Sequence, residues 1–441
     1  MIRVLTVSVA KSGIGVSPPA DEAKDRPAAP SRTGISGQRR ARWPSGYGRC
    51  GLRPALLLAF ACLSPPLAGV FADGRLLDSV IEAGAKAALA DGAGCLAAGQ
   101  ASDGGWQAFG RSHPAITALV VKALAQQAAF GPEHPAVRRG IEFLLQWLHS
   151  DGGIYVDGEG MRNYHTSVAL LALSAVGDPA HEQIRAGAQA FLEKLQWDEA
   201  EDHATSSTWY GGQGYGKHKR PDLSNTQLML EALHQSGLPA SDPVYKKAMR
   251  FVSRCQMLSE TNDQPFARGS TDGGFVYTPV NNGESKAGTE IIDGKPRLRS
   301  YGSMTYAGFK SLLYADVDRN DVRVQRALEW IRRHYTLDQN PNMPSSRSQE
   351  GLYYYYHVFA RAMATWGEER IVDSRGKVHH WRDDICAKLI ALQRPDGSWF
   401  NESDRWYEGN MHLVTAYAML ALQTALAEPS LASASRAGTE K

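Results

Sequence analysis

The tetrapeptide Asp103-Gly-Gly-Trp106 is the first of four closely similar turns in this 441-residue chain. It recurs as Asp151-Gly-Gly-Ile154, Asp272-Gly-Gly-Phe275 and Asp396-Gly-Ser-Trp399. The first two turns are 48 residues apart and the last two are 124 apart, which is two units of about 62. A Gly-rich segment at 210–216 (YGGQGYG) begins 59 residues after Asp151 and 62 before Asp272 and marks the unit between them. A period of this size predicts a repeat protein.

Helical periodicity fills the intervals between the turns. Ile116, Leu119, Val120 and Ala123, for example, have the spacing of one face of a helix. Helices are expected before the turns at 76–91, 134–148, 180–197, 244–256, 322–336 and 381–393, and after them at 113–127, 164–177, 224–238, 303–317, 353–367 and 412–426.

The two sets of helices differ in polarity. Those after the turns are nearly continuous in small and apolar residues, as at 166–176 (TSVALLALSAV), whereas those before carry charges such as Arg138, Arg139 and Glu142. A helix that is apolar on most sides is buried, and one with a charged face is not. The sequence therefore predicts an all-α fold, an (α/α)6 toroid of six inner and six outer helices.

The turns themselves have a structural explanation. An Asp side chain can accept bonds from local backbone donors, Gly takes the positive φ that reverses the chain, and the aromatic residue packs between outer helices. We therefore expect these aspartates to be structural rather than catalytic.

The segment Lys388–Trp399 (KLIALQRPDGSW) resembles the QW repeat of squalene-hopene and oxidosqualene cyclases. Arg139-Gly140-x-x-Phe143-Leu144, followed by Asp151-Gly152, has the same frame. The resemblance covers about 350 residues from Leu76 to the last expected helix, and it implies the toroid of terpenoid cyclases and protein prenyltransferases. That architecture also serves non-catalytic binding domains, so function must be argued from the site.

The cyclases that this chain resembles begin their reaction with a DxDD motif at the head of an inner helix. There a buried carboxylic acid stays protonated and attacks an alkene. The corresponding stretch is 221–226 (PDLSNT), where Asp222 matches the first Asp and Ser224 and Asn225 replace the other two. Asp222 is therefore the candidate catalytic residue, but a serine hydroxyl cannot protonate an alkene, and we do not expect cyclization by the family's mechanism.

Protein prenyltransferases, which the chain also resembles, bind zinc through an Asp, a Cys two residues on, and a His in a Tyr-His-Thr setting. Tyr164-His165-Thr166 reproduces the last fragment, and Asp384-Ile385-Cys386 has the spacing of the pair. That pair falls in an expected outer helix, where residues two apart point to different sides. We therefore expect no metal and no cofactor.

Residues 1–72 are expected to lie outside the fold. An apolar stretch at 54–67 (PALLLAFACLSPPL) follows several arginines and precedes small residues at 70–72, which is the pattern of a cleaved export signal. The stretch is too short and too Pro-interrupted to span a bilayer stably. A buried helix, a membrane anchor and a lipoprotein at Cys62 are the alternatives. We expect the toroid at 73–428, a flexible tail at 429–441, and a periplasmic or extracellular protein without a stable membrane span after cleavage.

The charge and the cysteine content argue against a nucleic-acid-binding protein and against a protein built on disulfides or a CxxC metal site. A net charge of +2 from 48 basic and 46 acidic residues lacks the basic excess of a nucleic-acid binder. Beyond residue 72 the cysteines are Cys95, Cys255 and Cys386. They stand too far apart in sequence to form a CxxC metal knuckle or to suggest a disulfide framework.

Aromatic and polar residues gather at the heads of the expected inner helices and in the preceding loops. Sites that bind ligands combine an aromatic wall with a few polar groups; the alternative is that these aromatics only fill space between helices. The predicted ligand-binding residues are His165, Trp209, Tyr210, Asn225, Tyr301, Tyr306, Tyr355, His357, Trp406 and His412. Two polar insertions, 258–271 and 278–299, are candidates for a lid.

Three functions stay open from sequence. An exported toroid that binds a hydrophobic isoprenoid-type ligand, a glycan or a protein partner explains the missing cyclase acids and zinc ligands without further assumption. The second is a cyclase-type or prenyltransferase-type enzyme with a non-standard acid. The third is a toroid polysaccharide lyase or hydrolase with Asp222, His165 or His357 as acid or base.

Overall fold

The computed structural model describes residues 77–216 and 219–428. The export signal predicted within residues 1–72 and the tail predicted at 429–441 lie outside the described residues. Within the described ranges, no helix is both long and apolar enough to cross a membrane.

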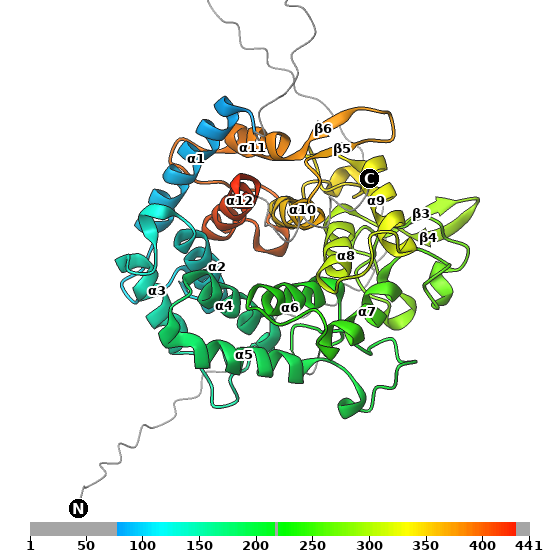
Figure 1. Cartoon of the computed structure of the whole chain (residues 1–441), viewed down its shortest axis with the longest axis horizontal. Helices are drawn as coiled ribbons and strands as arrows, with labels where there is room; N and C mark the ends of the chain where they lie inside the picture. The colour runs from blue at the N-terminus through cyan, green and yellow to red at the C-terminus, as the bar shows by residue number, and fades with distance from the viewer. Residues whose placement is uncertain (1–76, 217–218, 429–441) are drawn as a thin grey trace, which may run out of the picture. The chain divides into compact units, whose positions relative to one another are not determined.

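Twelve α-helices form in the described residues, in the alternating order that the sequence predicts (Figure 1). The outer helices are α1 (Ser79–Ala98), α3 (Pro135–Leu145), α5 (Glu182–Leu195), α7 (Pro243–Cys255), α9 (Val322–His334) and α11 (Trp381–Leu392). The inner helices are α2 (Pro114–Ala125), α4 (Arg162–Val176), α6 (Leu223–Gln235), α8 (Gly302–Tyr314), α10 (Leu352–Trp366) and α12 (Met411–Leu426).

The helices close into a double ring. Each inner helix packs on the next inner helix, and α12 returns to pack on α2, while α11 packs on α1 in the outer layer (Figure 1). Every residue of α8 is buried, whereas α3 keeps Arg138 and Arg139 exposed. The predicted (α/α)6 toroid is therefore confirmed, because the apolar helices do form the inner layer.

Each Asp-Gly turn is fastened by its own aspartate. The carboxylate accepts the backbone N–H two residues on, at 3.0–3.1 Å. The glycine after each aspartate has φ between 82° and 89°, a region that favours glycine. A Cβ there would lie only 2.3–2.5 Å from a carbonyl oxygen of the next outer helix. The four aspartates are thus structural, as predicted: Asp103, Asp151, Asp272 and Asp396.

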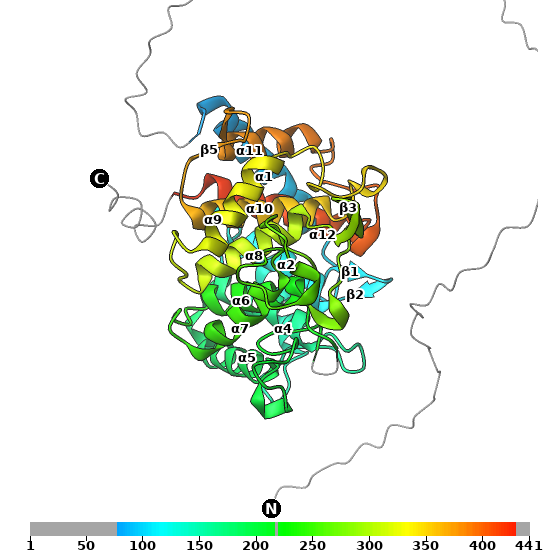
Figure 2. The same cartoon turned by 90° about the vertical axis from the view of Figure 1, so that its right-hand side faces the viewer.

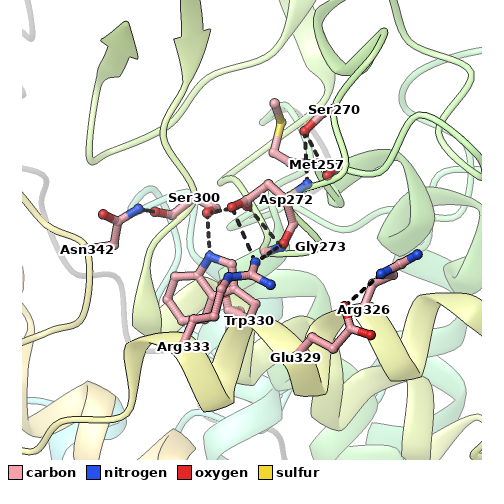
Figure 3. A network of polar contacts seen from close by, with 12 residues as sticks. Met257, Ser270, Asp272, Gly273, Ser300, Arg326, Glu329, Trp330, Arg333 and Asn342 are labelled. Carbon is pink, nitrogen blue, oxygen red and sulfur yellow. Dashed lines mark hydrogen bonds and ion pairs between the residues drawn. The ribbon is translucent and has the colours of Figure 1, made fainter. Parts of the chain in front are cut away.

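Figure 3 shows how the Asp272 turn joins its neighbours. The Asp272 carboxylate accepts from the Ser300 hydroxyl at 2.6 Å, and that hydroxyl accepts from the Trp330 indole N–H on α9 at 2.8 Å. Arg333, also on α9, donates to the Asp272 carbonyl. The turn therefore fixes the segment before α8 against the outer helix α9.

A repeated glutamine links the outer helices, and the sequence analysis identified it only at Gln393, within the QW-like segment. Its side-chain nitrogen donates at 2.8–3.0 Å to the carbonyl of the turn glycine and to a carbonyl of the neighbouring outer helix. The last of the four reaches Ala88 of α1 and so closes the outer ring. The four residues are Gln100, Gln196, Gln256 and Gln393.

Short antiparallel hairpins complete the described fold. They pair β1 (Gln107–Ala108) with β2 (Arg111–Ser112), β3 (Thr289–Ile292) with β4 (Lys295–Leu298), and β5 (Arg370–Val372) with β6 (Val378–His380). The β3–β4 hairpin, part of the insertion at 278–299, projects outward beside the outer helices rather than over the centre of the ring (Figures 1 and 2).

Candidate functional site

Asp222 is the N-cap of α6, at the end of the ring where the inner helices begin; we call this end the mouth. Its carboxylate accepts the Asn225 backbone N–H at 2.9 Å, and the Asn225 side-chain amide donates to both carboxylate oxygens at 2.9 and 3.1 Å. Asp222 is only 2% exposed. Asp222 thus lies at the head of an inner helix, and Asn225, three residues on, holds its carboxylate.

Burial sets the protonation of Asp222. It raises the pKa of the carboxyl to about 6, while hydrogen bonds from Asn225 and Tyr277 act in the opposite direction. Donors aimed at both oxygens favour the ionised form. At neutral pH this group therefore acts as an acceptor, whereas alkene protonation needs a carboxylic acid that keeps its proton.

We expect this raised pKa to appear in the pH dependence of stability. An acid whose folded pKa lies above its unfolded pKa keeps its proton longer in the folded state, so rising pH weakens the fold across that interval. Relative to Asp222→Asn, the wild type should lose about 2 kcal/mol of unfolding free energy between pH 4 and pH 7. Urea unfolding of both proteins measures it, and parallel pH profiles would contradict the assignment.

Six tyrosines form a connected group at the mouth, which reaches Asp222 through Tyr277. The Tyr277 hydroxyl donates to Asp222, and the Tyr215 hydroxyl is hydrogen-bonded to Tyr277 and Asn225. The Tyr354 hydroxyl accepts from the Gln227 amide at 3.0 Å, and the Tyr164 and Tyr417 hydroxyls are bonded to each other. We call this set the tyrosine cluster: Tyr164, Tyr215, Tyr277, Tyr301, Tyr354 and Tyr417.

Two buried glutamines beside the tyrosine cluster have polar atoms without a partner among the described residues. Gln213 is fully buried, its carbonyl bonds the Asp222 N–H, and neither side-chain atom is paired. The Gln227 side chain donates to Tyr354, but its oxygen has no donor. Buried polar groups are normally satisfied by protein, water or ligand. Gln213 holds the same turn position as Trp106 and Ile154, since its N–H donates to the Thr226 hydroxyl. The Gln227 oxygen is therefore the atom that offers a hydrogen bond to a polar group at the mouth.

His165 lies beside two residues that sequence reasoning missed, His113 and Glu159. The Glu159 carboxylate oxygen lies 3.1 Å from His113 Nε2 and 3.6 Å from His165 Nε2, and the three ligand atoms are close enough to hold a metal ion. However, Nδ1 of each His accepts a backbone N–H, from Ala115 and from Val156. The proton of each neutral ring then lies on Nε2. This hydrogen bonding is the opposite of what a metal on Nε2 needs. We therefore interpret the trio as a His113–Glu159 hydrogen bond with His165 beside it.

The residues that suggested a prenyltransferase zinc site do not meet. Asp384 accepts from the Tyr335 hydroxyl at 2.8 Å and lies 3.2 Å from His379, and Cys386 is buried. Among the described residues, ligand atoms of His165, Asp384 and Cys386 do not come together. Thr166 has a repeat role instead, because its hydroxyl accepts the turn N–H of Ile154, as Thr117 does for Trp106.

Several predicted ligand-binding residues lie away from Asp222. Trp209 stacks on His203 at 5.3 Å, and Tyr210 donates to Glu199 at 3.0 Å, both in the loop between α5 and α6. Tyr306 and Tyr355 pack against each other at 5.5 Å and are fully buried. The Tyr355 hydroxyl donates to the carbonyl of Thr336, which follows α9, so this pair faces the outer layer.

The remaining predicted residues lie at the starts of inner helices, except His357, which lies deeper in the ring. Trp406 lies against Gly351 at the start of α10, and His412 lies against Gly99 at the end of α1. His357 is stacked on Tyr417 and lies 3.9 Å from Glu231, farther along the inner helices. Asn225 and Tyr301 belong to the Asp222 group, and burial raises the pKa of Tyr301 well above its usual value.

Glu408, also missed in the sequence, is a second buried acid near the mouth. Burial raises its pKa to about 7. Its oxygens accept the N–H groups of Tyr353 and Tyr354 and the Asn401 amide. Glu408 therefore caps the first turn of α10 and is engaged in structure.

A groove of about 420 Å³ lies on the outer wall, between α7 and the start of α9. Its main charges are paired, Arg254 with Asp263 and Arg323 with Asp321. It borders none of the residues that surround Asp222, so the mouth is the candidate functional site.

Comparison with known proteins shows the fold. No protein-family model matches the chain, and no curated protein matches its sequence. Similar solved structures include an inactive variant of the α-1,6-mannanase GH76A from Salegentibacter in complex with α-1,6-mannotriose, with a TM-score of 0.51 and 8% identity over 78% of this chain and 100% of that one.

Two other similar structures have lower TM-scores. A type II terpene cyclase from Scytonema with its merosterolic acid product has a TM-score of 0.49 and 15% identity over 79% of this chain and 99% of that one. A protein from Actinoplanes has a TM-score of 0.47 and 18% identity over 78% and 100%. At these identities the likeness is one of fold, and the chain is an α/α toroid.

Proposed function

We propose that this toroid binds a carbohydrate at its mouth, with Asp222 as the acceptor of ligand hydroxyls. The observation that carries the proposal is the Asp222 carboxylate, held by Asn225 and by Tyr277 of the tyrosine cluster. Aromatic faces with a few fixed polar groups are what a compact polar ligand needs. A sugar brings apolar ring faces and hydroxyls that both donate and accept.

Gln227 favours a polyol over an isoprenoid. A hydrocarbon over Gln227 would leave its unpaired side-chain oxygen desolvated, at about 1–3 kcal/mol. A sugar hydroxyl would donate to it instead. The fold can accommodate a glycan, since the Salegentibacter mannanase variant is in complex with α-1,6-mannotriose.

Exposed aromatic residues at the rim support the same ligand class. Phe109 at the β1–β2 turn is 66% exposed, Tyr407 is 59% exposed, and their ring centroids are 4.7 Å apart. Both residues have positive φ, as does Trp406. Strained backbone of this kind persists where the surroundings impose it, often at ligand clamps. We propose that these rings stack on sugar units outside the mouth.

The proposal concerns binding rather than turnover. Glycoside hydrolysis generally needs two carboxyl groups flanking the bond, and near Asp222 the acids Glu159 and Glu408 are engaged by histidines and by the start of α10. Cyclase chemistry needs a protonated acid, whereas the donors around Asp222 favour its carboxylate. Membership of the squalene-cyclase repeat family stays a prediction from the QW-like segment.

We also propose that the protein acts outside the cytoplasm, because the pattern at 40–72 is that of an export signal. N-terminal sequencing of the protein recovered from the exported fraction tests this. A mature start near residue 73 is expected, and an intact start in the cytoplasm would contradict export.

The function is tested by a glycan array probed with residues 73–441. We expect a restricted set of bound oligosaccharides, and loss of their signal in Asp222→Asn. Glu82→Gln, at an exposed position on α1, is the control and should bind as the wild type does. If the array stays empty while a prenyl alcohol binds the wild type, the isoprenoid interpretation replaces this one.

A further inference from the structure

A second polar group lies farther along the inner helices, at a level we call the floor. Glu231 of α6 pairs with Lys310 of α8, lies 3.4 Å from Arg361 of α10 and is 3.9 Å from Lys122 of α2. His357, also on α10, is 3.9 Å from the same carboxylate. Nine residues of α6 separate Glu231 from Asp222, which at 1.5 Å per residue is about 13 Å. The floor is thus distinct from the mouth.

The floor carries more positive than negative charge. In the described part of the chain, the ion pairs of Lys122, Lys310 and Arg361 all go to Glu231. The fourth neighbour, His357, is kept neutral, because burial lowers its pKa to about 3. Three basic side chains therefore share one carboxylate, and one of them, Lys122, is only partly charged at pH 7.

The floor is also deeply buried. The side chains of Lys122, Lys310 and Glu231 are at most 3% exposed, whereas Arg361 keeps 25% exposed. Buried charge without full compensation is costly, and proteins normally pair it or bind an ion. Burial accordingly lowers the pKa of Lys122 to about 7. An anion that reached the group would meet Arg361 first.

Two polar neighbours orient the cations. Lys122 Nζ donates to the Gln235 side-chain oxygen at 2.9 Å, and Arg361 donates to the Tyr314 hydroxyl at 3.1 Å. The Nε of Arg361 faces Glu231 at 3.4 Å, and the Nδ1 of His357 has no hydrogen-bond partner among the described residues. The group therefore retains donor capacity that its single carboxylate does not use.

We propose that the floor binds an oxyanion, a sulfate, phosphate or carboxylate group, between Arg361 and Lys122. Guanidinium is suited to this role because its planar fork matches the geometry of oxyanions. Lys122 of α2 supplies a second basic group, whose charged form a bound anion would favour. The ion would offset the excess positive charge beside Glu231. This site does not depend on the proposed binding of carbohydrate at the mouth.

The test follows thermal unfolding in sodium sulfate against sodium chloride of matched ionic strength at pH 7. Sulfate stabilises most proteins without binding a specific site. Specific binding is therefore recognised by a rise in Tm that saturates with sulfate concentration and that changes in the Arg361 variants. We expect a saturable rise of about 3 °C in Tm for the wild type beyond the chloride series. Sulfate affinity should fall at least tenfold in Arg361→Gln, with an intermediate loss in Arg361→Lys. Arg250→Gln, which removes an exposed pair with Asp263, should match the wild type.

Two results would overturn the proposal: a rise that does not saturate, or one equal in Arg361→Gln and wild type. Either would mean that the cations only offset the carbonyl ends of the inner helices. If Arg361→Gln does not fold, the proposal is tested by whether the rise in Tm of the wild type saturates and by whether Arg361→Lys has a lower sulfate affinity. Titration with glucose 6-sulfate separates the sources, because binding tighter than inorganic sulfate indicates a group on a larger ligand.

Discussion

Gly211→Ala is expected to destabilise the protein by about 3 kcal/mol or more, which is at the severe end for a single methyl group. Gly211 has φ of +79°, and a Cβ there would lie 1.9 Å from the carbonyl oxygen of Lys247 on α7. The strained backbone alone costs about 1–2 kcal/mol, and the overlap adds to it because backbone on both sides must shift. Urea unfolding measures the difference.

The matched control is Gly237→Ala. Gly237 has φ of +91° but no atom within 4 Å of the added Cβ, so it reports the backbone strain alone. Gly211→Ala should therefore lose clearly more unfolding free energy than Gly237→Ala does. Equal losses would mean that the approach of the turn to the outer helix does not limit stability.

Glu231→Gln is expected to cost about 3–5 kcal/mol, because removing one partner of a buried ion pair leaves uncompensated charge. Here the neutral amide would face Lys122, Lys310 and Arg361 without a carboxylate among them. The exposed pair of Glu82 with Lys86 offers the comparison, since Glu82→Gln should change stability by about 0–1 kcal/mol.

Denaturant unfolding of the two variants at pH 7 checks this difference. A loss for Glu231→Gln as small as that for Glu82→Gln would show that the floor is hydrated and its charges screened. The charge excess argued for the floor would then not exist.

The fold could be predicted because its determinants repeat along the chain. Asp103, Asp151, Asp272 and Asp396 recur at near-regular spacing, and the helices between them alternate in polarity. The linking glutamines could not be recognised as a repeat because their distance from the turn varies. Gln100 is three residues before Asp103, but Gln256 is sixteen residues before Asp272. A residue that recurs in the fold at irregular sequence spacing, as these glutamines do, is hard to detect from a single sequence.

The site could be predicted only where one helix contains it. Asp222 and Asn225 are three residues apart, so the N-cap position of Asp222 and the approach of Asn225 follow from helix geometry. Glu231 meets its cations only because α2, α6, α8 and α10 converge when the ring closes. Such a cluster is invisible to periodicity, which treats Lys122 and Lys310 as isolated charges in apolar helices.

The aromatic residues show the same limit. Tyr354 and Tyr355 are neighbours in sequence, yet Tyr354 joins the cluster at the mouth while the Tyr355 hydroxyl bonds the carbonyl of Thr336. Neighbours on a helix point about 100° apart, so the register of α10 against the ring decides which one faces a ligand. Composition alone could not separate the two.

We propose above that the mouth of this toroid binds a polar, hydroxyl-rich ligand through Asp222. Isothermal titration calorimetry with the oligosaccharide selected on the array tests it most directly, on wild type and Asp222→Asn. We expect saturable binding to the wild type and an affinity at least tenfold lower in Asp222→Asn. Equal affinities, or binding of a prenyl alcohol in place of any oligosaccharide, would contradict it.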